Sequence, residues 1–198
     1  MQSSTRKERT QFRQRQILDA AVAAFAEKGF YKTRVSEIAR RAGVADGTIY
    51  LYFKSKDDIL ISLFEVRMEE VLQVIHEALL DCTDAEQRIH EFFRLYMSII
   101  DRDPALAEVI TIELRQSDKF IREYENPKFK ELLRYLASII GDGQREGIFR
   151  SEIDPRLTAR AIFGALDEVT LAGLFAKRPL ESSRMARSLS ELFVQGLR

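Results

Sequence analysis

The segment at residues 33–56, TRVSEIARRAGVADGTIYLYFKSK, combines small, hydroxyl, aromatic and basic residues. Gly47 carries no side chain, so its backbone can approach another molecule closely. Thr48 can hydrogen-bond a phosphate or contact a thymine methyl group, and Tyr50 and Tyr52 can reach phosphates or pack on sugars. Since residues two apart on a helix point in different directions, we expect Tyr50 to make the closer contact. This combination favours a surface that binds the major groove of DNA.

Further residues at both ends of this segment suit the phosphate backbone of DNA. Thr33, Arg34 and Ser36 lie at the predicted start of a helix, where free backbone N–H groups favour an anion. Lys54 and Lys56 follow the aromatic pair and can bind phosphates. On composition alone, the alternative is a pair of ordinary helices with a solvated basic face.

Two short helices around a glycine turn must position these side chains. The sequence predicts helices at residues 35–41 and 46–51, with Gly43 between them, where a positive φ angle is easily adopted. Ile49 and Phe53, four residues apart, share one face and are expected to anchor the second helix to the core. The predicted arrangement is a helix-turn-helix.

The rest of the chain also favours helices, because no stretch alternates apolar and polar residues long enough for a strand, and Gly and Pro are scarce. The expected fold class is therefore all-α. Apolar periodicity predicts further helices at residues 10–28, 56–80, 83–100, 104–116, 120–140, 155–176 and 182–197. The expected N-terminal caps are Thr33, Ser55 with Asp58, Thr83 with Glu86, Asp103 and Asp154.

The charge of the chain is zero overall but unevenly distributed. Residues 1–56 hold 12 Lys and Arg against 5 Asp and Glu, whereas residues 57–198 hold 19 against 26. A basic front on an acidic body is expected when one end meets phosphates and the other does not. The distribution therefore supports the DNA interpretation, which the net charge alone would oppose.

Other classes of protein find little support in the sequence. No apolar run approaches the roughly 20 residues of a membrane span, and the polar, basic N-terminus lacks the features of a signal peptide. Cys82 is the only cysteine and the two histidines, His76 and His90, are isolated, so we expect no disulfide, metal or other cofactor. No supported pairing of a nucleophile with a base is present, so we expect no enzyme. We expect a cytoplasmic protein.

The string AGVADGTIYLYFKSKDDIL resembles the helix-turn-helix signature of TetR-family repressors, and the similarity covers residues 10–70. It implies a three-helix DNA-binding domain at 10–70, with the helix-turn-helix at 33–52, and an effector-binding and dimerisation domain at 71–198. It also implies a homodimer on palindromic double-stranded operator DNA, with half-sites about 34–36 Å apart or a multiple of that distance. The positions that it marks as DNA-facing are Thr33, Ser36, Ala45, Asp46, Gly47, Thr48, Tyr50, Tyr52 and Lys56.

This chain departs from the TetR pattern at Ala45 and Asp46, where many relatives have Ser and a basic or polar residue. An aspartate near DNA is repelled by phosphate. Asp46 could accept a hydrogen bond from a cytosine amino group, or it could stabilise the N-terminus of the recognition helix. Of these two roles, the sequence favours the second.

The middle of the body, residues 84–150, is rich in aromatic and basic residues. The aromatic residues include Phe92, Phe93, Tyr96, Phe120, Tyr124, Phe129, Tyr135 and Phe149, and the basic ones include Arg115, Lys119, Arg122, Lys128, Lys130 and Arg134. One interpretation is an aromatic core beneath a solvated charged surface. The other is an apolar tunnel with a cationic mouth, which would suit a fatty chain that carries phosphates. The helices at 155–176 and 182–197 fit internal core or a dimer interface, and the TetR resemblance favours the interface.

The segments ADGTIYLYFKSKDDILISLF, IELRQS and AIFGALDE resemble the TetR-family repressors of fatty-acid degradation. This resemblance implies a long-chain acyl-CoA effector that weakens operator binding by favouring a different conformation, with the helix at 56–80 transmitting the change. The alternative effector is another lipophilic small molecule, as in regulators of multidrug efflux. The residues expected near the effector are Leu114, Arg115, Gln116, Phe163 and Asp167. Arg115 could instead pair with Asp167 or Glu168.

Overall fold

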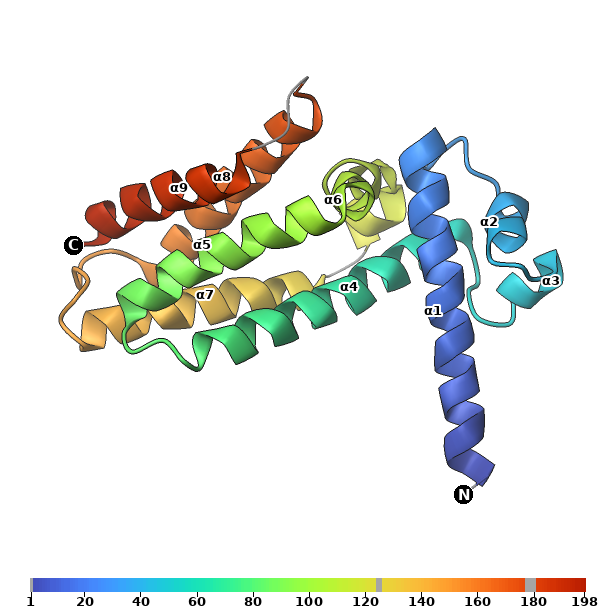
Figure 1. Cartoon of the computed structure of the whole chain (residues 1–198), viewed down its shortest axis with the longest axis horizontal. Coiled ribbons are helices and arrows are strands. Elements are labelled where there is room, and N and C mark those ends of the chain that lie inside the picture. Colours follow the sequence, from blue (N-terminus) through green and yellow to red (C-terminus); the bar gives the residue numbers. More distant parts are fainter. Residues whose placement is uncertain (1, 124–125, 177–180) are drawn as a thin grey trace. The chain divides into compact units, whose positions relative to one another are not determined.

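The computed structural model describes residues 2–123, 126–176 and 181–198, and all regular structure in these ranges is helical. The expected all-α fold is therefore confirmed (Figure 1). The α-helices are α1 Gln2–Lys28, α2 Val35–Arg41, α3 Asp46–Ile49, α4 Lys56–Leu79, α5 Ala85–Arg102, α6 Pro104–Thr111, α7 Pro127–Arg145, α8 Pro155–Leu174 and α9 Ser182–Leu197. A 3-10 helix, η1 Glu113–Gln116, and a π-helix, η2 Lys119–Glu123, lie between α6 and α7. Within the described ranges, no helix has the length and apolar character needed to cross a membrane.

The chain forms two compact units, and α4 contributes to both. Unit 1 comprises Met1–Val66 and Ala105–Tyr124, and unit 2 comprises Arg67–Pro104 and Glu125–Arg198. The change of unit within α4 comes before the domain boundary that the sequence predicts between residues 70 and 71. In addition, the segment of α6, η1 and η2 packs with the N-terminal helices, although its place in the sequence suggested the body.

Unit 1 is built around an apolar stripe of α1. Ile17, Ala21 and Phe25 are fully buried, at the three- to four-residue spacing of one helix face. α2 contacts both α1 and α3, and its Ile38 is fully buried. Helices as short as α2 and α3 are unstable alone, so tertiary packing of this kind must hold them.

Unit 2 has an aromatic core centred on α5. Phe92 and Phe93 of α5 are fully buried, and Phe149 is almost so. α5 packs along α9, where the rings of Phe93 and Phe193 lie 5.8 Å apart, and α7 packs along α8. These residues therefore fill the core, as one of the two interpretations of the aromatic set expected. Tyr124, from the same set, lies outside the described residues.

The single helix predicted at residues 120–140 is wrong. Asn126 adopts a left-handed conformation with a φ of 51°, and α7 begins at the next residue, Pro127. The Asn126 side chain accepts a hydrogen bond from the backbone N–H of Phe129 at 3.0 Å, as an N-cap residue does. Asparagine is among the few residues that tolerate the left-handed region, and proline suits the first turn of a helix. The Asn-Pro pair is thus the start signal that the prediction overlooked.

The helix cap predicted at Thr83 is displaced by a single residue. The N-cap of α5 is Asp84 rather than Thr83, because the Asp84 carboxylate accepts a hydrogen bond from the backbone N–H of Gln87 at 2.8 Å. The caps predicted at Ser55 and Asp154 are confirmed, since each side chain accepts a hydrogen bond from the first turn of its helix.

At Gly143, α7 passes very close to its neighbours. A Cβ atom at this position would overlap the ring of Phe149 and lie 2.9 Å from the Cβ atom of Ala85. Gly141 lies on the same helix, but a Cβ atom there would meet only the flexible end of Arg145, at 3.5 Å. The two glycines therefore differ in whether packing requires them.

We expect Gly143→Ala to lower the free energy of unfolding by about 1–3 kcal/mol, the usual cost of overpacking a core. Gly141→Ala is the matched control and should raise it by up to about 1 kcal/mol, because alanine is the better helix former. Chemical denaturation of both variants measures the difference. Equal stability of the two variants would contradict the close packing at Gly143.

Candidate DNA interface

A tight turn joins α2 and α3 and fixes their angle. Gly43 adopts a φ of +64°, and the N–H of Val44 donates to the carbonyl of Ala39 at 3.0 Å. Ile49 and Phe53 are buried, as predicted, and the N–H of Phe53 donates to the carbonyl of Ile49 at 3.0 Å, so helical turns continue beyond α3. The buried pair anchors α3 to unit 1 and leaves its opposite face uncovered.

Most of the predicted DNA contacts lie on the surface of unit 1. The exposed ones are Arg34, Ser36, Ala45, Asp46, Gly47 and Tyr50, and the half-buried ones are Thr48 and Tyr52. Tyr50 has 59% of its surface exposed, so it is the more accessible of the two tyrosines. These residues are therefore accessible to a DNA molecule.

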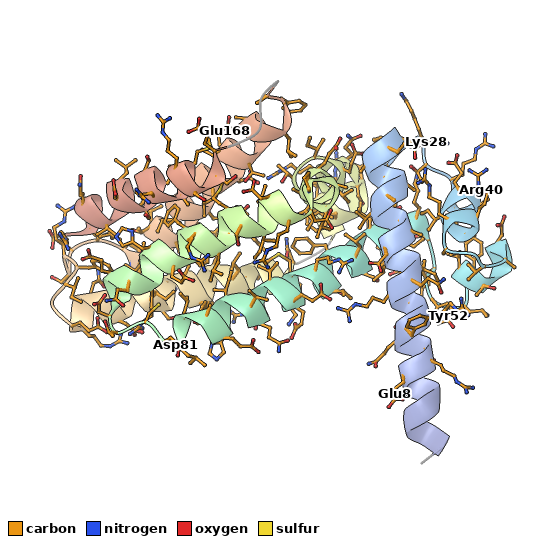
Figure 2. The ribbon with its side chains drawn as sticks, viewed as in Figure 1. Glu8, Lys28, Arg40, Tyr52, Asp81 and Glu168 are labelled. Carbon is orange, nitrogen blue, oxygen red and sulfur yellow. The ribbon has the colours of Figure 1, made fainter. Side chains whose placement is uncertain are left out.

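Sequence reasoning missed two exposed residues, one on α2 and one just after α3. Leu51 directly follows Tyr50 and is 80% exposed, and Arg40 extends from α2 into solvent (Figure 2). Their positions in the sequence could have indicated this, since neither falls on the apolar positions that face the core. A leucine can contact a thymine methyl group and an arginine can bind a phosphate, so both belong with the candidate interface.

Thr33 has a different place from the one predicted. Its side chain is buried, and its hydroxyl group donates to the carbonyls of Ala24 at 3.1 Å and Gly29 at 2.8 Å. Ala24 belongs to the C-terminal part of α1, and Gly29 directly follows the helix. Thr33 therefore secures the turn at residues 29–33, between α1 and α2, and does not face solvent.

Lys56 also serves the turn at residues 29–33. Its ammonium group donates to the carbonyls of Phe30 at 2.6 Å, Tyr31 at 3.1 Å and Thr33 at 3.0 Å, and it lies 4.5 Å from the centre of the Phe30 ring. An ammonium group has three donors, and these carbonyls use all of them. Partial burial lowers the pKa of Lys56 below its usual value of 10.5. The geometry makes Lys56 a positioning residue rather than the phosphate partner that the sequence suggested.

Glu113 of η1 contacts the same turn. The carboxylate is buried and accepts a hydrogen bond from the backbone N–H of Phe30 at 2.5 Å. Gly29 has a φ of +78°, and a Cβ atom there would lie 3.4 Å from the carboxylate. Three residues after Glu113, the backbone carbonyl of Gln116 accepts a hydrogen bond from the Tyr31 hydroxyl group at 2.7 Å. Two successive residues of the turn are thus bonded to η1.

The segment that contains η1 is bonded to α4 as well. The buried Ser117 donates from its hydroxyl to the carboxylate of Asp57, in the first turn of α4, at 2.6 Å. The rings of Phe64 and Phe120 meet edge to face at 5.4 Å. The residues from Glu113 to Phe120 therefore connect the turn before α2 with the helix after α3.

The start of α2 is fixed by a carboxylate. The N-cap is Arg34 rather than the predicted Thr33. Glu37 accepts a hydrogen bond from the Arg34 N–H at 2.9 Å and forms an ion pair with Lys28 at the end of α1. The Arg34 N–H, followed by Lys28, lowers the pKa of Glu37 from 4.5 to about 2. The carboxylate therefore stays charged, which favours the N-terminal end of a helix.

The five residues predicted near an effector are divided between the units. Leu114, Arg115 and Gln116 form part of η1 in unit 1, and Phe163 and Asp167 lie on α8 in unit 2. Leu114 is buried, and the Arg115 guanidinium donates to the carbonyl of Thr111.

Phe163 belongs to a cluster of three rings from three helices of unit 2. Its ring lies 4.6 Å from that of Phe129 on α7 and 6.3 Å from that of Tyr96 on α5, with both pairs edge to face. All three side chains are half-buried. Phe163 is therefore in an apolar setting that is not closed to other molecules.

Two of the predicted cations, Lys128 and Arg122, form ion pairs within the protein. Lys128 pairs with Glu69 and Glu131, which raise its pKa, and Arg122 lies 3.6 Å from the carboxylate of Asp118. At these two positions the structure fits the interpretation of a charged surface better than that of a cationic mouth.

Two family models together account for most of the chain. Residues 17–63 match the model described as bacterial regulatory proteins, tetR family, and residues 64–196 match the model described as YsiA-like protein, C-terminal region. The chain belongs to the TetR family. It is therefore a DNA-binding transcriptional repressor, and the helix-turn-helix of unit 1 is its DNA-binding element. The family resemblance found in the sequence is confirmed.

Within the TetR family, the chain is similar to regulators of fatty-acid metabolism. The chain is 37% identical to the fatty acid metabolism regulator protein of Bacillus subtilis, over 92% of this chain and 94% of the relative. The crystal structure of FadR from B. subtilis with stearoyl-CoA matches with a TM-score of 0.86 and 37% identity, covering 92% of this chain and 98% of that one. The fatty acid degradation regulator FadR from Bacillus halodurans matches with a TM-score of 0.88 and 37% identity, covering 94% and 96%.

Variants of Lys54 and Lys56 can distinguish a lysine that binds a DNA phosphate from a lysine that holds the turn at residues 29–33. Lys54 is exposed, so we expect Lys54→Met to reduce the slope of log affinity against log salt by about 0.9, the value for one lost phosphate contact. Lys56→Met should lower the melting temperature and the operator affinity but leave this slope unchanged, because its donors serve three carbonyls. Equal loss of slope in both variants would show that Lys56 also binds phosphate.

Proposed function

We propose that this TetR-family repressor binds palindromic operator DNA as a homodimer in the cytoplasm and controls genes of fatty-acid degradation. In this proposal, long-chain acyl-CoA releases the protein from the operator. The observation that carries the effector is the 37% identity, over 92% of the chain, to a FadR protein whose structure holds stearoyl-CoA.

The exposed face of α3 supports the DNA half of the proposal. Buried Ile49 and Phe53 hold this helix against unit 1, while Asp46, Gly47 and Tyr50 face solvent. A recognition helix enters the major groove with its N-terminal residues toward the base edges. One such helix per subunit requires a two-fold dimer to read two half-sites, which is why the operator should be palindromic.

The cluster of Tyr96, Phe129 and Phe163 supports the effector half. Aromatic rings contributed by α5, α7 and α8 offer apolar surface to an acyl chain, and such pockets usually combine apolar lining with a few polar groups. Asp167 lies one turn beyond Phe163 on the same helix and is also half-buried. We assign Phe163 and its two partner rings to the acyl chain.

The connection between the units supplies a route from effector to operator. The helix α4 belongs to both units, and the chain passes from unit 2 into unit 1 and back again around α6, η1 and η2. Residues of η1 hold the turn before α2 through Glu113. A ligand shifts an equilibrium only by its difference in affinity for two states, so acyl-CoA must prefer a state in which the turn and α3 no longer fit the operator.

The test begins by selecting binding sites from random double-stranded DNA with the wild-type protein. Affinity for the selected site is then measured by fluorescence anisotropy at fixed salt, with and without stearoyl-CoA. We expect stearoyl-CoA to weaken operator binding by roughly 5- to 150-fold, the usual range of allosteric coupling, and the operator to weaken stearoyl-CoA binding by the same factor.

Free CoA and acetyl-CoA are the controls, because they carry the same phosphates without a long acyl chain. Both should leave operator affinity close to its starting value. Unchanged affinity at saturating stearoyl-CoA would rule out the acyl-CoA effector, while release by an unrelated lipophilic compound instead would identify a multidrug-type regulator.

A further inference from the structure

We propose that Asp46 is a specificity-determining residue that reads a cytosine in each operator half-site by accepting a hydrogen bond from the cytosine N4 amino group. This inference rests on the proposed function, in which α3 enters the major groove. It reverses the role that the sequence alone favoured for Asp46, which was to stabilise the N-terminus of the recognition helix.

The position of Asp46 places it where bases are read. It is the first residue of α3, and the N-terminal residues of a recognition helix contact base edges. Its neighbours are Ala45 and Gly47, and neither has a side chain that can form a hydrogen bond. Among residues 45–47, the Asp46 carboxylate is therefore the one side-chain group that can recognise a base by hydrogen bonding.

The carboxylate is not occupied within the protein. Asp46 is exposed, Ala45 is the N-cap of α3, and no side chain caps this helix end. In the part of the chain that the structure describes, the Asp46 side chain takes part in no hydrogen bond or ion pair. Asp84 and Asp154 are the N-cap residues of α5 and α8 and accept backbone hydrogen bonds there, whereas Asp46 lies in the first turn of α3 and keeps its acceptor oxygens available.

The chemistry of the major groove selects the base. An ionised carboxylate only accepts hydrogen bonds, so it needs a donor, and the groove offers donors only at cytosine N4 and adenine N6. The adenine donor lies between two acceptors, its own N7 and the O4 of the paired thymine. The cytosine donor has an acceptor, guanine O6, on one side only. Neighbouring acceptor atoms therefore repel a carboxylate less at cytosine than at adenine.

The same carboxylate discriminates against other bases. Facing guanine or thymine, it would lose water and meet only acceptors, near phosphates of the same charge. An unpaired buried charge or acceptor is costly, so rejection of the wrong base adds to attraction by the right one. Asp46 should therefore reduce affinity for most sequences while it sharpens the choice at one base pair per half-site.

The experiment compares the sites that wild-type, Asp46→Asn and Asp46→Ala proteins select from random double-stranded DNA, with affinities measured on single-base variants. The wild-type protein should require cytosine at one symmetric pair of positions, with roughly 5- to 150-fold weaker binding to another base there. Asp46→Asn should shift the preference to adenine, because an amide can bond both N6 and N7. Asp46→Ala should lose the preference at that position and keep it elsewhere.

Asp81→Asn is the charge-matched control, since Asp81 is an exposed aspartate that follows α4 in unit 2 (Figure 2). It should change no base preference. Circular dichroism melting shows whether each variant is folded. If Asp46→Ala changes affinity for all sequences by one common factor, or changes nothing, the base-reading role is overturned while DNA binding stands. If the wild-type protein selects no sequence, the proposed function itself is wrong, and the role of Asp46 is overturned with it.

Discussion

The hydrogen bonds to the turn at residues 29–33 are the constraint on which the DNA-binding element depends. Lys56 from α4 donates to three carbonyls of the turn, and Glu113 from η1 accepts from the N–H of Phe30. The hydrogen bond between Glu113 and Phe30 is buried, and a buried polar group left without a partner would cost about 1–3 kcal/mol, so the turn has few alternative conformations. Because α2 begins two residues after the turn ends, the position of the helix-turn-helix is set there.

This constraint explains why residues far apart in sequence serve one function. Phe30 and Glu113 are separated by 83 positions, yet they meet in unit 1 because α6, η1 and η2 pack with the N-terminal helices. The chain that carries Glu113 enters from unit 2 and returns to it. In the proposed function, this path of the chain would let a change in unit 2 reach the DNA-binding element without a separate signalling domain.

The sequence predicted the helix-turn-helix and its family because their signals are local. The spacing of Ile49 and Phe53 follows from the helical repeat, and Gly43 marks a turn by its own conformational freedom. The sequence could not separate phosphate contacts from structural ones. A hydroxyl or an ammonium group bonds a backbone carbonyl as readily as a phosphate, so Thr33 and Lys56 looked like DNA contacts until their partners were seen. Nothing local distinguished a base-reading role of Asp46 from stabilisation of the helix N-terminus by its charge.

Operator affinity of Glu113 variants at fixed salt is the measurement that bears most directly on the central claim, that η1 positions the DNA-binding element. Each variant is first shown to be folded at the assay temperature. Glu113→Ala should weaken binding by roughly 5-fold or more, as expected from an unsatisfied N–H worth about 1 kcal/mol or more, with the salt slope unchanged. Glu113→Gln keeps an acceptor and should stay closer to wild type. A folded Glu113→Ala protein that binds the operator as tightly as wild type would contradict the claim.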